Sequence, residues 1–293
     1  MAVQQHSQLD ERRSAEERPI VSFQVITDTH VRAESEHVHN RNLDKALKDI
    51  LVNCPDSIGI MHVGDVTDHG LDAEFAELHR ILADNAAELP RLLLTTGNHD
   101  VGLGIWESRI GRFLKETGMQ APYHDHWIAG YHFIFLGTER GLELFCDLSD
   151  EQLTWLEAKL AENSVANKPK FLFLHQPLLD TVGGSFKAQG WYGVTQDERV
   201  KEILSNYPNV VLFTGHTHWE LEAGYARSVE TASMPAMFNA ASVAYLWTDL
   251  DEHKDGSQGY YVDVYEDKVL VKGRDFTTGT WIPGAQFEVP SRR

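Results

Sequence analysis

The chain predicts an α/β fold, because short apolar runs rich in β-forming residues alternate with segments of helical periodicity through its first three quarters. A second observation supports this class: polar residues gather where the apolar runs end, as they do at the ligand-binding edge of an open sheet. Strands are expected within residues 21–28, 57–65, 91–100, 131–138, 170–177 and 209–216.

Helices are expected between these strands. Two apolar stripes at helical spacing mark two of them. The stripes consist of Leu43, Leu47, Ile50 and Leu51, and of Phe75, Leu78 and Leu82. Capping boxes, in which Ser or Thr is followed three residues later by Gln or Glu, indicate two further helix starts at Ser149 and Thr195.

From about residue 238 the helical periodicity stops and strands follow one another. Tyr260, Val262 and Val264 alternate as strand residues do, and residues 266–268 indicate a tight turn into the next strand. We therefore expect a single domain over residues 20–293 whose C-terminal quarter, about 238–293, forms a second and more antiparallel sheet. The polar residues 1–19 are expected to be a disordered or loosely attached N-terminal arm.

The composition bounds the class of protein and its partners. With 293 residues, 42% hydrophobic and 24% charged, the chain is globular. Its formal net charge of −18 argues against long nucleic acids and anionic membranes, which are polyanions. Cys54 and Cys146 have no metal-binding or redox spacing and are expected to be reduced thiols. No apolar run approaches the roughly 18 residues of a membrane span, and the first twenty residues lack a signal-peptide core, so we expect a cytoplasmic protein.

Polar motifs stand at the ends of five expected strands. Because the carboxyl ends of neighbouring strands share one edge of an open α/β sheet, these motifs are expected to converge on one site. Their polar residues are Asp28 and His30, Asp65 and Asp68, Asn98, His99 and Asp100, His175, and His216 with His218. Carboxylate, amide and imidazole ligands without thiolates suit Mn²⁺, Fe or Zn²⁺. Gly64, Gly97 and Gly215 each precede a candidate ligand and permit close approach or unusual backbone angles there.

In this order the motifs resemble those of the calcineurin-like metallophosphoesterases, whose pattern is DxH, GDxxD, GNH(D/E), an isolated H and GHxH. The chain reads DTH, GDVTD, GNHD, H and GHTH across residues 28–218, with no ligand position missing. The resemblance implies a sandwich of two mixed β-sheets flanked by helices, in four layers, with a two-metal site at one edge.

Carried over residue by residue, the resemblance implies a ligand set. One metal would be held by Asp28, His30 and His218 and the other by Asn98, His175 and His216, with Asp65 and a water or hydroxide bridging the two ions. Asn98 and His99 would contact the substrate, and His99 would donate to a phosphoryl oxygen or to the leaving group. Asp100 would orient His99 and keep it protonated.

Such a site would supply the positive charge that the acidic chain lacks. Two divalent ions carry four positive charges, and Asp28, Asp65 and a bridging hydroxide return about three, which leaves roughly +1 for an anionic substrate. Paired metals also lower the pKa of a bound water to about 7 and stabilise the attacking and leaving oxygens. Asn98 is neutral on this account because a third carboxylate would cancel the remaining charge.

The second motif bears on the substrate. Phosphoprotein phosphatases of this superfamily continue GDxVDRG, with an arginine that grips the phosphate, whereas this chain has His69 at that place. Loss of that bidentate cation favours a diester monoanion, and the short chain resembles bacterial class III cyclic-nucleotide phosphodiesterases and glycerophosphodiesterase-like relatives. The expected activity is therefore hydrolysis of a small phosphodiester by a metal-bridging hydroxide. A phosphomonoesterase, a nucleotide pyrophosphatase, a nuclease and a non-catalytic scaffold of the same fold are the alternatives.

Two features near the motifs have two interpretations each. The glycine-rich segment 181–194, with Trp191 and Tyr192, is either a lid or a base-stacking wall at the site, or a surface loop. Asp68 either supports a ligand or caps a turn.

Residues outside the motifs yield weaker predictions. Arg32 and Trp219 are candidates for the rim of the site because they follow ligands closely. Of the 15 histidines, five stand in the motifs, and the other ten, among them His6, His124 and His126, are expected at the surface. The strand-rich C-terminal quarter would suit a homodimer contact.

Overall fold

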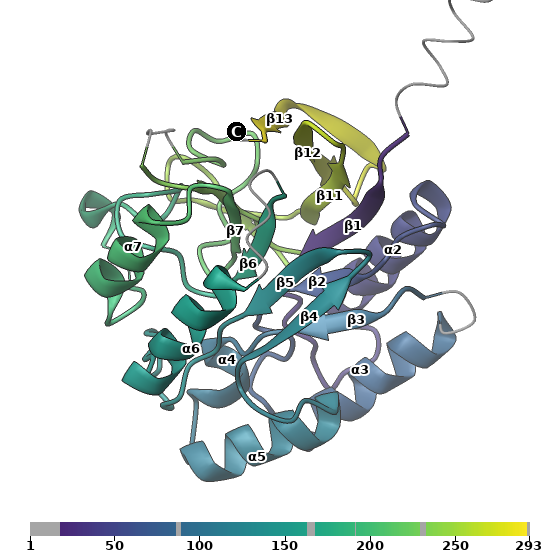
Figure 1. Ribbon diagram of the computed structural model, residues 1–293. Helices are drawn as coiled ribbons and strands as arrows, with labels where there is room; N and C mark the ends of the chain where they lie inside the picture. The colour runs from purple at the N-terminus through teal and green to yellow at the C-terminus, as the bar shows by residue number, and fades with distance from the viewer. Residues whose placement is uncertain (1–17, 86–88, 163–167, 191, 229–232, 292–293) are drawn as a thin grey trace, which may run out of the picture.

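The computed structural model describes residues 18–85, 89–162, 168–190, 192–228 and 233–291. Two sheets lie face to face, with helices on the outer side of each (Figure 1). The expected sandwich of two mixed sheets flanked by helices is therefore confirmed. Of the expected N-terminal arm, residues 1–17 lie outside the described residues.

The first sheet is mixed. Its strands are β1 (Val21–Ile26), β2 (Ile60–His62), β3 (Leu92–Leu94), β11 (Gln258–Val264), β12 (Lys268–Asp275) and β13 (Thr280–Pro290). β1, β2 and β3 are parallel neighbours, and β11, β12 and β13 continue the sheet antiparallel from the other side of β1.

The second sheet contains β4 (His124–Ile128), β5 (Tyr131–Phe135), β6 (Lys170–Phe173), β7 (Val210–Thr214) and β8 (Ala236–Asn239). β4 and β5 form an antiparallel hairpin, and β5 to β8 are parallel neighbours. A small hairpin of β9 (Leu246–Trp247) and β10 (His253–Lys254) lies outside both sheets.

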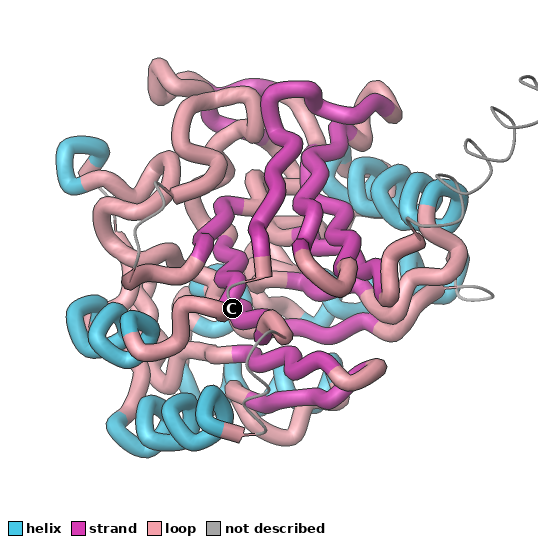
Figure 2. The backbone as a smooth tube through the Cα atoms, turned by 45° about the horizontal axis from the view of Figure 1, so that its top comes forward, coloured by secondary structure: helices cyan, strands magenta, loops and turns pink. Residues whose placement is uncertain are grey.

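The helices lie on the flanks of the strands, as Figure 2 shows. They are α2 (Val38–Asn53), α3 (Asp72–Asp84), α4 (Asn98–Val101), α5 (Trp106–Thr117), α6 (Asp150–Ala161), η1 (Lys187–Gln189) and α7 (Asp197–Ser205). Helices α2, α3 and α5 pack on the outer face of the first sheet, and α6 and α7 on that of the second. No helix in the described part of the chain is both long and apolar enough to cross a membrane.

Aromatic rings fill the space between the two sheets. The ring of Phe23 on β1 lies 4.8 to 6.5 Å from those of Phe133, Phe171, Phe173 and Phe213 in the facing sheet. These five side chains are fully buried. Because interdigitated rings allow little sliding, they fix the position of one sheet against the other.

The loops after β1, β2, β3, β6 and β7 meet at one edge of the sandwich. Asp28 N donates to Gly64 O and His30 N to Asp65 O, each at 3.0 Å, so the loops after β1 and β2 are bonded to each other. In the second sheet, Gly215 N donates to the carbonyl of His175 at 2.9 Å. These contacts join the ends of β1 and β2 in one sheet and the ends of β6 and β7 in the other.

The C-terminal quarter differs from its prediction. Its strands do not form a separate sheet, because β11 pairs with the open edge of β1 and covers the unpaired backbone groups there. Residues 238–247 do not form one strand either. β8 ends at Asn239 and pairs parallel with β7, and the chain then returns over the strand ends before β9 begins.

Some local predictions also differ. Ser149 caps α6 as expected, accepting from Gln152 N, but the N-cap of α7 is Gln196 and not Thr195. The strand β4 and the helix α5 were not expected. His62 and His132 are buried and not at the surface, because Thr29 and Asp125 give their rings polar partners.

Two of the histidines that were expected at the surface are only partly exposed. His124 and His126 lie on β4, and both are half-buried. His6 lies outside the described residues.

Candidate metal centre

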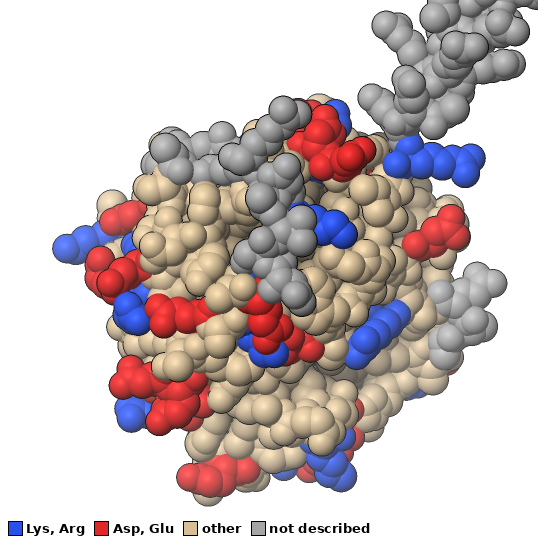
Figure 3. Space-filling view, in the orientation of Figure 1, with Lys and Arg blue, Asp and Glu red and all other residues tan. Residues whose placement is uncertain are grey.

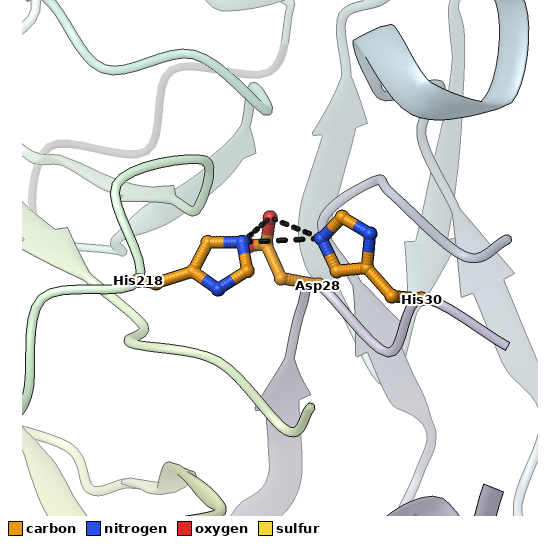
Figure 4. A group of neighbouring side chains, drawn as sticks. All are labelled: Asp28, His30 and His218. Carbon is orange, nitrogen blue, oxygen red and sulfur yellow. Dashed lines mark hydrogen bonds and ion pairs between the residues drawn. The ribbon is translucent and has the colours of Figure 1, made fainter. Parts of the chain in front are cut away.

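Asp28, His30 and His218 come together where β1 and β7 end (Figure 4). All three side chains are buried. The Nε2 atoms of His30 and His218 lie 3.1 Å apart. Asp28 Oδ1 lies 3.0 Å from His218 Nε2 and 3.7 Å from His30 Nε2. Among the described residues, Asp28 Oδ1 makes no hydrogen bond. A buried, unsatisfied carboxylate oxygen that faces two imidazole nitrogens is a ligand set for a cation.

A second group lies beside the first, at the ends of β2, β3, β6 and β7. It contains Asp65, His175 and His216, together with the amide of Asn98. Asn98 Oδ1 lies 3.2 Å from His175 Nε2 and 3.0 Å from His216 Nδ1. Asn98 Nδ2 donates to the carbonyl of Glu143 at 2.9 Å, and since a carbonyl can only accept, this bond turns the amide oxygen toward the imidazoles.

Asp65 lies between the two groups. Its Oδ2 is 3.1 Å from His175 Nε2 and 3.8 Å from His30 Nε2. Its Oδ1 accepts a hydrogen bond of 2.8 Å from the backbone N of His99. One carboxylate oxygen therefore faces a ring nitrogen of each group, which is the position that a shared ligand requires.

Acceptors behind three of the imidazoles set the direction of their lone pairs. A ring nitrogen that faces a carboxylate or carbonyl oxygen carries the proton, so the opposite nitrogen presents its lone pair. The acceptors of the Nδ1 atoms are Asp68 Oδ1 for His30 (3.1 Å), Val63 O for His175 (2.7 Å) and Tyr245 O for His218 (3.1 Å). In each ring the Nε2 lone pair therefore points to the centre.

The two buried carboxylates of the centre attract positive charge. Burial by itself raises the pKa of a carboxyl group, but His218 and His175 hold the pKa of Asp28 well below its usual value, and His175 does the same for Asp65. Burial would likewise lower the pKa of His30, yet hydrogen bonds to neighbouring carboxylates raise it to about 10. A divalent cation would take over this compensation and release the proton, as metal binding to such ligands does.

The ligands reach this geometry through an uncommon backbone conformation. Left-handed φ values occur at Asp28 (51°), His30 (42°), Asp65 (51°), His216 (70°) and His218 (56°). Residues with a Cβ rarely adopt this conformation, and it is concentrated at functional sites. In an extended strand, side chains i and i+2 point the same way but stand almost 7 Å apart. The left-handed turns bring Asp28 and His30 into the same group and aim His216 and His218 into the two adjacent groups.

Gly97 and Gly215 let the loops come into direct contact with the ligands. A Cβ at Gly97 would lie 2.0 Å from Asp65 Oδ1, and one at Gly215 would lie 2.5 Å from Asp28 Oδ2. A side chain at either position would displace a ligand carboxylate, which is why these positions require glycine.

His99 lies at the mouth of the centre. Its ring is half-buried and packs edge-on against the ring of His30, with 4.5 Å between centroids. Its Nδ1 donates to the carbonyl of Asp68 at 2.7 Å, so Nε2 is the ring atom left for a bound molecule.

Asp100 does not hold His99, contrary to the expectation. Its carboxylate accepts from the backbone nitrogens of Val66, Thr67 and Gly97 and from the Thr67 hydroxyl. Asp100 therefore shapes the loop that carries Asp65, and the Asp68 carbonyl takes the place that Asp100 was expected to occupy.

Asp68 supports the centre, which decides between its two interpretations. Its Oδ1 faces His30, and its Oδ2 pairs with the guanidinium of Arg32 and lies 3.0 Å from His69 Nδ1. Arg32 lies beside the centre as expected, with 34% of its side chain exposed, but its charge is already paired.

Trp219 does not line the rim. Its ring is buried, with 6% exposed, and its Nε1 donates to Asp249 Oδ1 at 3.2 Å. Within segment 181–194, the half-exposed ring of Tyr192 packs against Phe145 with 5.4 Å between centroids. Trp191 lies outside the described residues.

Three residues at the centre have no signal in the sequence. Tyr245 and Glu143 act through their backbone carbonyls, which any residue type supplies. His39 near the start of α2 faces the carbonyl of His30 with its Nδ1 at 3.1 Å, although it stands outside every motif.

Comparisons with known proteins agree with this geometry. The family model described as calcineurin-like phosphoesterase matches residues 22–220. A protein of Rhodococcus erythropolis described as a probable cyclic nucleotide phosphodiesterase is 24% identical over 277 residues, which is 88% of this chain and 85% of that protein.

Two solved structures have a similar fold. A purple acid phosphatase from yellow lupin (Lupinus luteus) seeds has a TM-score of 0.67 and 12% identity over 94% of this chain, which spans only 55% of the length of that enzyme. GAP50, the anchor in the inner membrane complex of Plasmodium, has a TM-score of 0.62 and 11% identity over 93% of this chain and 89% of its own.

At such low identity the solved structures show the fold alone. The family model covers more than half of the chain and includes all the motifs from Asp28 to His218. The ligand groups fit the divalent metal ions that this family uses. The chain therefore belongs to the calcineurin-like phosphoesterase family and is a phosphoric ester hydrolase.

Proposed function

We propose that this protein hydrolyses a small phosphodiester, of the cyclic-nucleotide or glycerophosphodiester class, at a centre of two metal ions. The observation that carries the proposal is the position of Asp65 Oδ2, which faces a ring nitrogen of each ligand group at 3.1 and 3.8 Å. Asp28, His30 and His218 would hold one ion, and Asn98, His175 and His216 the other.

The donor set suits several metals. Mn²⁺, Fe and Zn²⁺ all accept carboxylate and amide oxygens together with imidazole nitrogens. When bound as a pair, such ions lower the pKa of a water molecule to about 7 and stabilise the charge on the attacking and leaving oxygens.

His99 is the proton donor in this proposal. Two contacts fix its ring, because its backbone N donates to Asp65 Oδ1 and its Nδ1 donates to the Asp68 carbonyl. Its Nε2 is therefore the atom that donates to a phosphoryl oxygen or to the leaving-group oxygen. An alkoxide is a poor leaving group at neutral pH, so a proton delivered to it lowers the barrier to cleavage.

The charges at the mouth favour a diester over a monoester. Arg32 is paired with Asp68. Arg109 donates to the backbone carbonyls of His69, Gly70 and Leu103, so both guanidinium groups have partners. His69, which stands where related phosphatases carry an arginine, is itself held by Asp68 and Glu74 at 3.0 and 3.1 Å. A diester carries one negative charge fewer than a monoester dianion and needs less compensation. The description of the R. erythropolis relative supports the same substrate class.

Long nucleic acids are disfavoured as substrates. The formal net charge is −18, and on the face in Figure 3 the described acidic and basic side chains are interspersed, with no broad basic area among them. A long polyanion gains most of its affinity from such an area.

A purely structural role is also disfavoured. The centre buries two carboxylates and several imidazoles, and the buried Oδ1 of Asp28 has no hydrogen-bond partner among the described residues. Desolvation of these groups is destabilising, and a pure binding scaffold has no function that would require it.

The proposal is tested by the turnover of Mn²⁺-reconstituted protein on bis(4-nitrophenyl) phosphate beside 4-nitrophenyl phosphate. We expect kcat/KM to be higher for the diester by about tenfold or more, and we expect EDTA to abolish turnover and Mn²⁺ to restore it. A preference for the monoester would contradict the phosphodiesterase assignment, and chelator-resistant turnover would contradict the metal centre.

Asp65→Asn is expected to reduce the metal content from about two equivalents per chain to one or fewer, because both ions share this ligand. Metal content is measured by mass spectrometry after dialysis. Asp56→Asn, at an exposed position, is the matched control and should keep about two equivalents. Full metal content in the Asp65 variant would remove the bridging assignment.

His99→Ala is expected to keep its metals and to lower kcat on a diester with an alkoxide leaving group by about 10² to 10⁴, the usual effect of losing a general acid. His79→Ala serves as the control, since this exposed histidine contacts α5 through the Glu116 carbonyl. If the His99 variant turns over at the wild-type rate, His99 has a structural role and donates no proton.

A further inference from the structure

The segment between β8 and β9 is fixed against the metal centre by its backbone. Ala244 N donates to the carbonyl of Asp28 at 3.1 Å, and Trp247 N donates to that of His218 at 2.9 Å. Tyr245 lies between these two anchors, so the place of its side chain is set by the same loops that carry the ligands.

The ring of Tyr245 lies against two candidate ligands of one metal and beside two further rings. Its centroid is 4.3 Å from that of His218 and 5.9 Å from that of His30. The rings of His39 and His253 lie 5.7 and 5.2 Å from it, nearly parallel, with interplanar angles of 30° and 29°. We call Tyr245, His39 and His253 the aromatic wall. Its members come from α2, from the loop after β8 and from β10.

The aromatic wall is not part of the hydrophobic core. Core rings such as Phe23 are fully buried, whereas Tyr245 and His39 are half-buried and His253 is exposed. The hydroxyl of Tyr245 makes no hydrogen bond to any described residue. A partly exposed ring with an unused hydroxyl, placed beside a metal centre, is available to a bound molecule.

The aromatic wall and His99 occupy different places around the centre. The His99 ring packs on His30 at 4.5 Å, and it makes no ring contact with the three described rings of the wall. A diester has two ester groups. If His99 serves the group that leaves, the wall lies beside the group that stays on the phosphate.

We propose that the aromatic wall contacts the ester group that is not cleaved and selects diesters in which that group carries a planar ring. This inference rests on the proposed phosphodiesterase activity. A flat ring gains stacking against Tyr245 and its neighbours, whereas a small alkyl or glycerol group gains little. The wall therefore favours nucleotide-like diesters over glycerophosphodiesters at this centre.

The test uses two diesters with the same leaving group, bis(4-nitrophenyl) phosphate and methyl 4-nitrophenyl phosphate. The kcat/KM for bis(4-nitrophenyl) phosphate divided by that for methyl 4-nitrophenyl phosphate reports on the ester group that stays on the phosphate. We expect this ratio to fall about tenfold in Tyr245→Leu, within the range that loss of a stacked ring produces, and to change little in Tyr245→Phe, which keeps the ring. Trp281→Leu is the control and should leave the ratio unchanged, since this half-exposed ring on β13 packs on Tyr261.

The metal content of each variant is measured beside its kinetics, because Tyr245 contacts the ligand His218. An unchanged ratio in fully loaded Tyr245→Leu overturns the inference. If that variant loses metal, His253→Ala decides in the same way, since among the described residues its ring contacts those of Tyr245 and Trp247 and not that of a candidate ligand. Equal turnover of both diesters by the wild-type protein overturns the inference alone, whereas no metal-dependent turnover of either overturns the proposed function.

Discussion

The candidate metal centre depends on left-handed backbone turns at the ends of β1, β2 and β7. Each such residue costs about 1 to 3 kcal/mol and persists only where its surroundings over-determine it. Hydrogen bonds between the loops do this, because Asp28 N donates to Gly64 O and His30 N to Asp65 O, while Ala244 N donates to Asp28 O. The backbone strain is thus held by neighbouring loops. The result is that Asp28 and His30, two residues apart, face a single point, whereas His216 and His218 enter the two adjacent groups.

Both sheets contribute ligands, so the centre lies on the seam of the sandwich. Asp28, Asp65 and Asn98 follow strands of the first sheet, and His175 and His216 follow strands of the second. The rings packed around Phe23 hold the two sheets in register and thereby set the distance between the ligand groups. A metal that binds only this folded arrangement stabilises it in proportion to the logarithm of its concentration, so metal binding and the packing of the sandwich support each other.

The sequence was sufficient for most of the strands and for the candidate ligands, because both depend on local pattern. Apolar runs marked β1, β5, β6 and β7, and the motifs directly after strands placed Asp28, Asn98 and His216 near one another. What it could not supply were contacts between distant segments.

Those contacts account for several of the missed or mistaken predictions. Tyr245 meets His218 and His39 only because the chain returns over the site after β8. Asp100 was expected beside His99 by its place in the motif, but its carboxylate is taken up by the backbone of a different loop, at Val66 and Thr67. The strand β4 has polar residues at most positions and lacks the apolar run by which the other strands were found.

The central claim is that these turns build one centre for two metal ions that share Asp65. Anomalous X-ray diffraction from crystals of the Mn²⁺-loaded protein tests it most directly. The account predicts two peaks, one among Asp28, His30 and His218 and the other among Asn98, His175 and His216, with the carboxylate of Asp65 in contact with both. A single peak, or two peaks that leave Asp65 bound to one ion only, would contradict it.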